Sequence, residues 1–229
     1  MQPYADAVDV DEFLDLVETE LGPSGFTPAT ALPLLSVCRD ELMAEFRRDV
    51  RRRWGHFFDV ASLGGMPLLG RTGVAAALGH APLDGVRHRL LVLALPHIGL
   101  EDGVVGSVLR PGVPGMTSAC GAISVAREAL AAGVSGVVLD RHDIEESLLV
   151  ARLYASVGTG DVPDLVTATE LVRRAAVDEL RLLAGELSTP ADPVDVALVS
   201  GIVVHATGDD RVSGVEIEIL RRHGDTDAA

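Results

Sequence analysis

Short, continuous apolar runs alternate along this chain with longer segments whose apolar residues recur at helical spacing. The clearest run is Leu90–Leu95, and Pro96, which cannot donate to a strand ladder, ends it. A second run covers Val134–Leu139. Runs of this length are typical of strands buried on both faces of a parallel sheet. We therefore expect an α/β fold with a mostly parallel central sheet flanked by helices.

The remaining pattern predicts five helices and a terminal hairpin. Gly22–Pro33, rich in Pro, Gly, Ser and Thr, is expected to be a loop. Val194–Thr207 and Val212–Leu220, joined by residues 208–211, are expected to form a C-terminal β-hairpin. The predicted helices are Asp9–Leu21, Ser36 to about Trp54, Ser118 to about Ala132, Asp143–Val157, and Pro163 to about Leu187.

Two stretches stand outside this pattern. Residues 55–85 contain seven glycines and few charges, which indicates close backbone packing around a pocket or a partner. Residues 189–193 are expected to be a hinge and residues 224–229 a frayed tail. Without a repeat or an interdomain linker, residues 1–229 are expected to form a single domain.

Charge and composition restrict the possible partners and compartments. The net charge of −15 disfavours nucleic-acid binding. An arginine cluster at residues 47–53 is expected to be a solvated or ion-paired helix face. No apolar run is long enough to cross a membrane, and the acidic N-terminus does not resemble a secretory signal, so we expect a cytoplasmic protein.

Candidate chemistry is carried by two cysteines and one histidine. Cys38 and Cys120 are the only cysteines, and each is expected in the first turn of a helix, where the helix dipole favours a thiolate. His97 is expected in a turn just past the carboxyl end of the Leu90–Leu95 strand, where α/β sheets bind ligands. Two thiolates and an imidazole suit Zn²⁺ with a fourth position open. Spacing alone leaves open the alternative of two buried, inert cysteines and an unrelated histidine.

Several motifs surround these residues. Cys38-Arg39-Asp40-Glu41 is similar to the Cys-x-Asp signature of β-type carbonic anhydrases. The other motifs, in chain order, are Gly64-Gly65, Thr72-Gly73, residues 80–85, Leu95-Pro96-His97-Ile98-Gly99, Asp102-Gly103, Gly106, Arg110 with the following Pro-Gly, and Ala119-Cys120-Gly121-Ala122. Together, over roughly residues 35–125 and in the family's order, they resemble the limiting-CO2-inducible B proteins, which are theta-type carbonic anhydrases.

The resemblance implies a β-carbonic-anhydrase-like fold, a homodimer with sites near the subunit interface, and zinc on Cys38, His97 and Cys120. Asp40 would then either hydrogen-bond the zinc-bound water or, in a closed state, ligate zinc. The sequence departs from the β-type pattern at Leu42, where an arginine normally orients the aspartate. Arg110 is our candidate replacement and Arg47 the second choice.

The function implied by the resemblance is reversible hydration of CO2 to bicarbonate through zinc hydroxide. His80 lies at a family position, where it would line the pocket, pass protons or make a structural hydrogen bond. Two alternatives remain at this point: a catalytically silent zinc protein that senses CO2 or bicarbonate or joins an assembly, and a hydrolase for another small molecule such as carbon disulfide.

Overall fold

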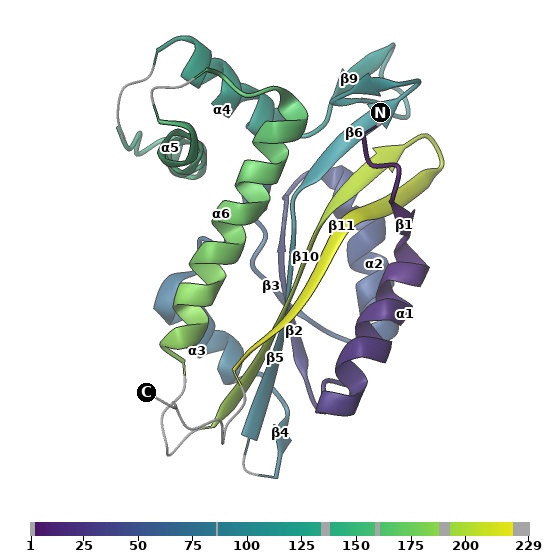
Figure 1. Ribbon diagram of the computed structural model, residues 1–229, viewed down its shortest axis with the longest axis vertical. Helices are drawn as coiled ribbons and strands as arrows, with labels where there is room; N and C mark the ends of the chain where they lie inside the picture. The colour runs from purple at the N-terminus through teal and green to yellow at the C-terminus, as the bar shows by residue number, and fades with distance from the viewer. Residues whose placement is uncertain (1–2, 86, 134–137, 159–160, 188–192, 222–229) are drawn as a thin grey trace.

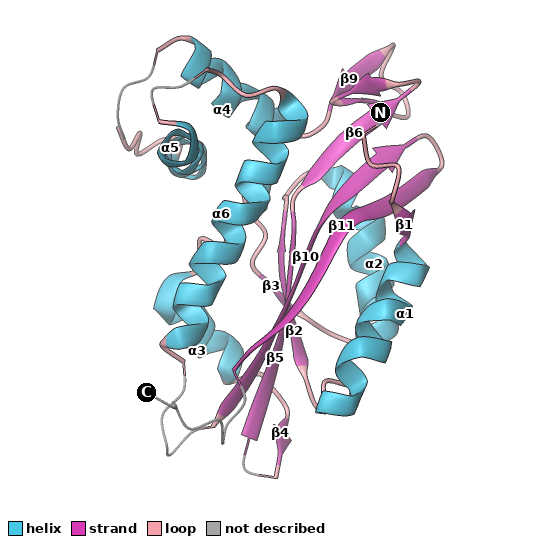
Figure 2. Cartoon of the chain, viewed as in Figure 1, coloured by secondary structure: helices cyan, strands magenta, loops and turns pink. Residues whose placement is uncertain are grey.

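A mixed sheet lies between two layers of helices (Figures 1 and 2). Helices α1 and α2 cover one face, and α3 and α6 cover the other. Helices α4 and α5 lie beside one end of α6 and contact it. The computed structural model describes residues 3–85, 87–133, 138–158, 161–187 and 193–221.

The helices are α1 (Val10–Leu21), α2 (Ala44–Trp54), α3 (Gly70–Leu78), α4 (Gly121–Ala131), α5 (Ile144–Val157) and α6 (Leu165–Gly185), with short 3-10 turns at Gly22–Ser24, Glu41–Met43 and Leu63–Gly65. The strands are β1 (Val8–Asp9), β2 (Leu32–Val37), β3 (Phe58–Asp59), β4 (Leu83–Asp84), β5 (Arg87–Leu95), β6 (His97–Glu101), β7 (Val104–Val105), β8 (Ser107–Leu109), β9 (Met116–Ser118), β10 (Val194–Ala206) and β11 (Asp209–Arg221).

The main sheet has the order β1-β11-β10-β5-β2-β3, and β6 pairs with the far half of β10. The central pairs β2–β3, β2–β5, β5–β10 and β6–β10 are parallel, whereas β10 and β11 form an antiparallel hairpin. The predicted α/β architecture, with its parallel centre and C-terminal hairpin, is therefore confirmed.

Strand β5 shows why the apolar run is continuous. Leu91 and Leu93 belong to the core cluster that also contains Phe13 of α1, whereas Leu90 and Val92 face the cluster that contains Val74 of α3. Because successive side chains of a strand point to opposite faces, a strand covered on both sides must be apolar at every position.

The predictions for residues 22–54 were partly wrong. Leu32–Val37 is strand β2, all of whose residues are buried, and α2 begins only at Ala44. Ser36 does not cap a helix, because its hydroxyl donates to the Gly65 carbonyl at 2.9 Å. Pairing with β5 and β3 buries this segment on both faces, and no local capping signal outweighs that gain.

Two boundaries near the candidate site also differ from prediction. His97 is not in a turn: after Pro96 the chain continues as β6, with His97 opposite Val203 of β10. The helix expected from Ser118 begins at Gly121, because residues 116–118 pair with β8 as strand β9. In both places, pairing with a distant strand extends the β structure.

Other predicted segments have mixed outcomes. The helices expected at Asp9–Leu21, Asp143–Val157 and 163–187 are confirmed as α1, α5 and α6. Of the strand expected at Val134–Leu139, residues 134–137 lie outside the described residues, and Val138 and Leu139 are exposed and not in a strand. The tail 224–229 and most of the hinge 189–193 also lie outside the described residues.

The arginine cluster on α2 is an ion-paired surface, as expected. Arg48 pairs with Glu45, Arg52 contacts Asp11, and Arg53 contacts Asp15. Exposed pairs of this kind contribute little to stability. None of the helices in the described ranges combines the length and apolar character needed to cross a membrane.

Candidate metal centre

Cys38 lies immediately beyond the carboxyl end of β2, a strand between β5 and β3, and not in the first turn of a helix where it was expected. It forms a parallel bridge with Ser62, and the neighbouring Arg39 amide donates to the Ser62 carbonyl at 3.0 Å. Gly65, with φ of +79°, approaches so closely that a Cβ there would lie 3.3 Å from the Cys38 nitrogen. The glycine-rich segment thus packs its backbone directly against this cysteine, as the glycine content predicted.

His97 is the first residue of β6, which pairs with β10. Its side chain is fully buried, and neither ring nitrogen has a hydrogen-bond partner among the described residues. The Pro96 carbonyl accepts from the Val203 amide at 2.9 Å, which anchors the backbone beside the ring to β10. A buried imidazole with two unpaired nitrogens is costly unless a ligand satisfies it.

Cys120 is the N-cap residue of α4, so its thiol projects from the start of the helix. The preceding residue, Ala119, holds it against β6: the Ala119 carbonyl accepts from the Gly99 amide at 3.1 Å, and the Ala119 amide donates to the Gly106 carbonyl at 2.9 Å. The third side chain is therefore positioned by the β6–β9 segment and not by neighbours in sequence.

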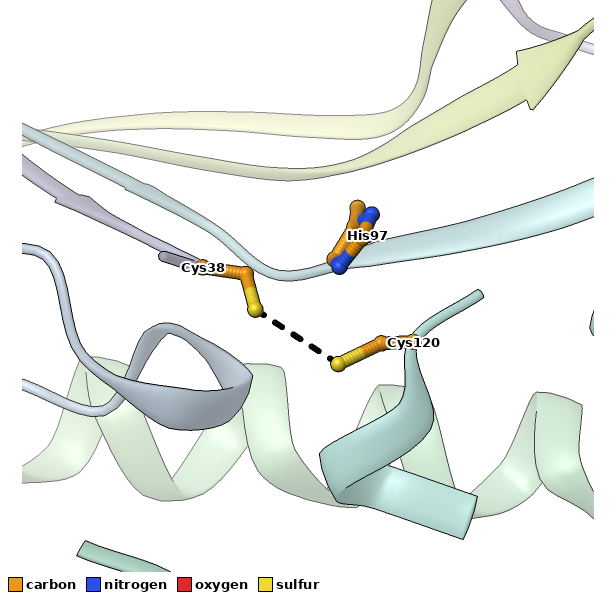
Figure 3. Close-up of side chains that lie close together, drawn as sticks. All are labelled: Cys38, His97 and Cys120. Carbon is orange, nitrogen blue, oxygen red and sulfur yellow. Dashed lines mark hydrogen bonds between the residues drawn. The ribbon is translucent and has the colours of Figure 1, made fainter. Parts of the chain in front are cut away.

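The three side chains converge from β2, β6 and α4 (Figure 3). The two sulfur atoms are 3.5 Å apart, and one ligand atom from each residue lies within 4.8 Å of the others. A tetrahedral Zn²⁺ with Zn–S bonds of about 2.3 Å holds two sulfurs about 3.8 Å apart. The donor set, its spacing and the unpaired nitrogens of His97 therefore fit zinc.

The two thiols affect each other's protonation. The hydrogen bond with Cys120, assisted by His97, lowers the pKa of Cys38, and the same hydrogen bond together with burial raises the pKa of Cys120. The metal-free pair therefore favours one thiolate and one thiol. Because zinc takes both as thiolates, metal binding must release a proton.

Asp40 and Arg110 lie beside this cluster. Asp40 Oδ2 is 3.8 Å from His97 Nε2, and Arg110 Nη2 is 3.3 Å from both oxygens of Asp40. Asp40 Oδ1 also accepts from the Leu42 amide at 3.1 Å, so the carboxylate caps the 3-10 turn as well. Burial raises the pKa of the Asp40 carboxyl. The carboxylate is thus held in one orientation at the edge of the cluster.

Arg110 is itself tightly held, in the turn between β8 and β9. It donates to Thr117 Oγ1 at 2.5 Å, to the Ser118 carbonyl at 2.7 Å and to Glu41 Oε1 at 2.5 Å, and it lowers the pKa of Glu41 to about 2. Of the two arginines considered for orienting Asp40, the structure brings Arg110 to the carboxylate. Arg47 instead donates to the Cys38 carbonyl at 2.8 Å.

A model of one protein family, described as limiting CO2-inducible proteins B/C beta carbonic anhydrases, matches residues 7–217. The chain belongs to this family. Within the LCIB/C family, solved structures show the same fold. The crystal structure of limiting CO2-inducible protein LCIB has a TM-score of 0.74 at 24% identity, covering 94% of this chain and 95% of that one. PtLCIB4, a homolog of LCIB, has a TM-score of 0.77 at 23% identity, covering 95% and 93%.

A search of curated proteins finds no match. The similarity to LCIB and PtLCIB4 confirms the β-carbonic-anhydrase-like fold. Membership of the LCIB/C family and the Cys-His-Cys cluster together identify a carbonic-anhydrase-like domain with a candidate metal site.

Three residues near the site escaped the sequence reasoning. Glu41 shares Arg110 with Asp40, His205 of β10 adjoins His97, and Asp210 of β11 contacts His205. The hairpin register could have revealed the last two, because the turn after Ala206 places His205 opposite Asp210. His80, by contrast, is exposed, and its ring packs against that of Phe58 at an angle of 44°.

Proposed function

We propose that this LCIB/C-family protein is a zinc-dependent carbonic anhydrase that catalyses the reversible hydration of CO2 to bicarbonate. The observation that carries the proposal is the half-buried Asp40 carboxylate, held by Arg110 at 3.3 Å next to the Cys38–His97–Cys120 cluster. A purely structural zinc site is closed by four protein ligands, whereas three ligands and an adjacent carboxylate are typical of a catalytic site.

When bound, zinc supplies the Lewis acidity that turns water into a nucleophile at neutral pH. Cys38, His97 and Cys120 would hold the ion. Asp40 would accept a hydrogen bond from the attacking water and so direct its lone pair at CO2. Arg110 would keep the Asp40 carboxylate in the orientation that this hydrogen bond needs.

The Asp40→Asn variant distinguishes between the two proposed roles, an enzyme and a catalytically silent zinc-binding protein. Asparagine keeps the oxygen that accepts from the Leu42 amide but removes the charge that Arg110 holds. We expect about one zinc per chain and an unchanged fold, with kcat/KM for CO2 hydration lowered about ten- to a hundredfold, as for other groups that orient a metal-bound ligand. Stopped-flow hydration assays on protein of known zinc content measure this.

Glu41→Gln is the matched control, because it removes the other carboxylate that contacts Arg110 and leaves Asp40 in place. Activity that Asp40→Asn leaves intact would refute the role of Asp40. A wild-type protein that is fully loaded with zinc and yet inactive at every pH would refute the enzyme and favour a CO2 or bicarbonate sensor.

We also expect a homodimer that uses the glycine-rich segment 55–79. Helix α3 buries Val74 and Ala77 in the core and exposes the small residues Ala75 and Ala76, which would allow a second copy to approach closely. Light scattering at micromolar concentration should give twice the chain mass, and Ala76→Arg should shift it toward the monomer. Glu20→Arg, on the exposed face of α1, is the control; a monomeric wild type would refute this interface.

A further inference from the structure

A row of three polar side chains crosses the sheet behind the metal centre. His97 of β6 lies next to His205 of β10, and His205 lies opposite Asp210 of β11. His205 is only 3% exposed, and its Nδ1 is 2.7 Å from Asp210 Oδ1. Asp210, with 23% of its side chain exposed, is the outermost member of the row.

The strand register makes His97 and His205 neighbours. Val203 pairs with His97 and His205 pairs with Gly99, so the two histidines are diagonal neighbours on one face of the sheet. Their ring centres are 5.0 Å apart, with the planes at 78°. No hydrogen bond joins the two rings in this edge-on arrangement, but two imidazoles linked by an N–H···N bond of about 3 Å also have their centres about 5 Å apart.

The nitrogens that are left unpaired are complementary. His97 Nε2 is the nitrogen near Asp40, so His97 Nδ1 is left without a partner on the other side of the ring. Asp210 can only accept when ionised, which places the His205 proton on Nδ1 and leaves His205 Nε2 as an acceptor. That Nε2 is buried and also lacks a partner among the described residues.

We propose that Asp210 and His205 form a relay that positions His97: Asp210 accepts from His205 Nδ1–H, and His205 Nε2 accepts from His97 Nδ1–H, so that His97 presents Nε2 to the metal. His205 and Asp210 are positioning residues in this scheme. A metal-ligating histidine normally donates its second N–H to an acceptor that fixes its tautomer and raises its basicity. The relay rests on the proposed zinc site, which it deepens.

The first experiment measures zinc affinity by competition with a chromophoric chelator. Since loss of such an acceptor typically costs ten- to a hundredfold in metal affinity, we expect His205→Phe, which fills the space without a nitrogen, to weaken zinc binding by about that factor. His205→Gln restores an acceptor at the Nε2 position and should recover most of the affinity. Asp210→Asn can donate to His205 Nδ1, reverse the tautomer and weaken binding. Asp209→Asn, one residue away on an exposed side chain that pairs with Arg211, is the matched control.

The second experiment does not depend on zinc. Long-range ¹H–¹⁵N spectra of the metal-free protein should show His97 and His205 both as Nδ1–H tautomers, and Asp210→Asn should shift His205 to the Nε2–H form. A protonated Nε2 on His205 in the wild type, or a His205→Phe variant with wild-type zinc affinity, overturns the relay. A wild type that fails to bind zinc refutes the proposed function, and the tautomers of the metal-free protein then decide the relay by themselves.

Discussion

Cys38→Ser, His97→Ala and Cys120→Ser are each expected to leave the purified protein with less than about a tenth of the zinc held by the wild type, which should carry about one ion per chain. The three ligand atoms lie within 4.8 Å of one another and come from separate elements, and the chain has no third cysteine to replace a lost thiolate. CO2 hydration should fall with the zinc content. Elemental analysis and stopped-flow assays of the same samples provide the measurement.

His88→Ala is the control for this series. His88 lies in β5, and its ring nitrogen Nδ1 contacts the Ala81 and Pro82 carbonyls instead of the cluster. The His88→Ala variant should therefore retain the full zinc content of the wild type. Full zinc content in all three ligand variants would rule out this metal centre.

The zinc affinity of the wild type should also depend on pH. Because the metal-free cysteine pair must lose a proton when zinc binds, this affinity should weaken as the pH falls.

Glu146→Gln is expected to stabilise the protein at pH 8 by up to about 3 kcal/mol and to have little effect near pH 4.5. Glu146 is 9% exposed at the start of α5, and its Oε1 has no partner among the described residues. Burial, with a contribution from Asp143, raises the pKa of its carboxyl from 4.5 to about 7. Glutamine fills the same space without a charge that must be buried.

The direction of this pH dependence follows from the difference in proton binding between the folded and unfolded states. Between about pH 4.5 and pH 7 the folded state holds the Glu146 proton more tightly than the unfolded state, so the free energy of unfolding falls as the pH rises. Above about pH 7 Glu146 is ionised in the folded state as well, so the full free-energy cost of burying its charge is present. Urea unfolding of zinc-free wild type and variant at several pH values measures the difference. Glu20→Gln, at an exposed position on α1, is the control, and a gap between wild type and Glu146→Gln that does not change with pH would contradict the prediction.

The elements that were predicted correctly depend on local patterns. Phe13, Leu14 and Val17 recur at helical spacing because one side of α1 is buried, and Leu90–Leu95 is apolar throughout because both faces of β5 are covered. Strand β2 was missed because its pairing partners, β5 and β3, are distant in sequence. Its preceding loop signals and Ser36 suggested a helix start, and only burial between two strands overrides them.

For the site, the sequence by itself determined the chemistry: two cysteines, a histidine, the Cys-x-Asp motif of β-type carbonic anhydrases, and the wider set of motifs that gives the LCIB/C resemblance. It also supplied Arg110 as a candidate partner for Asp40, and that contact exists because the β8–β9 turn folds back over the 3-10 turn that Asp40 caps. Only the tertiary structure decided that His205 and Asp210 lie behind His97. Their alignment depends on the registers of β6 with β10 and of β10 with β11, and a shift of one residue in either would turn the side chains to the opposite face of the sheet.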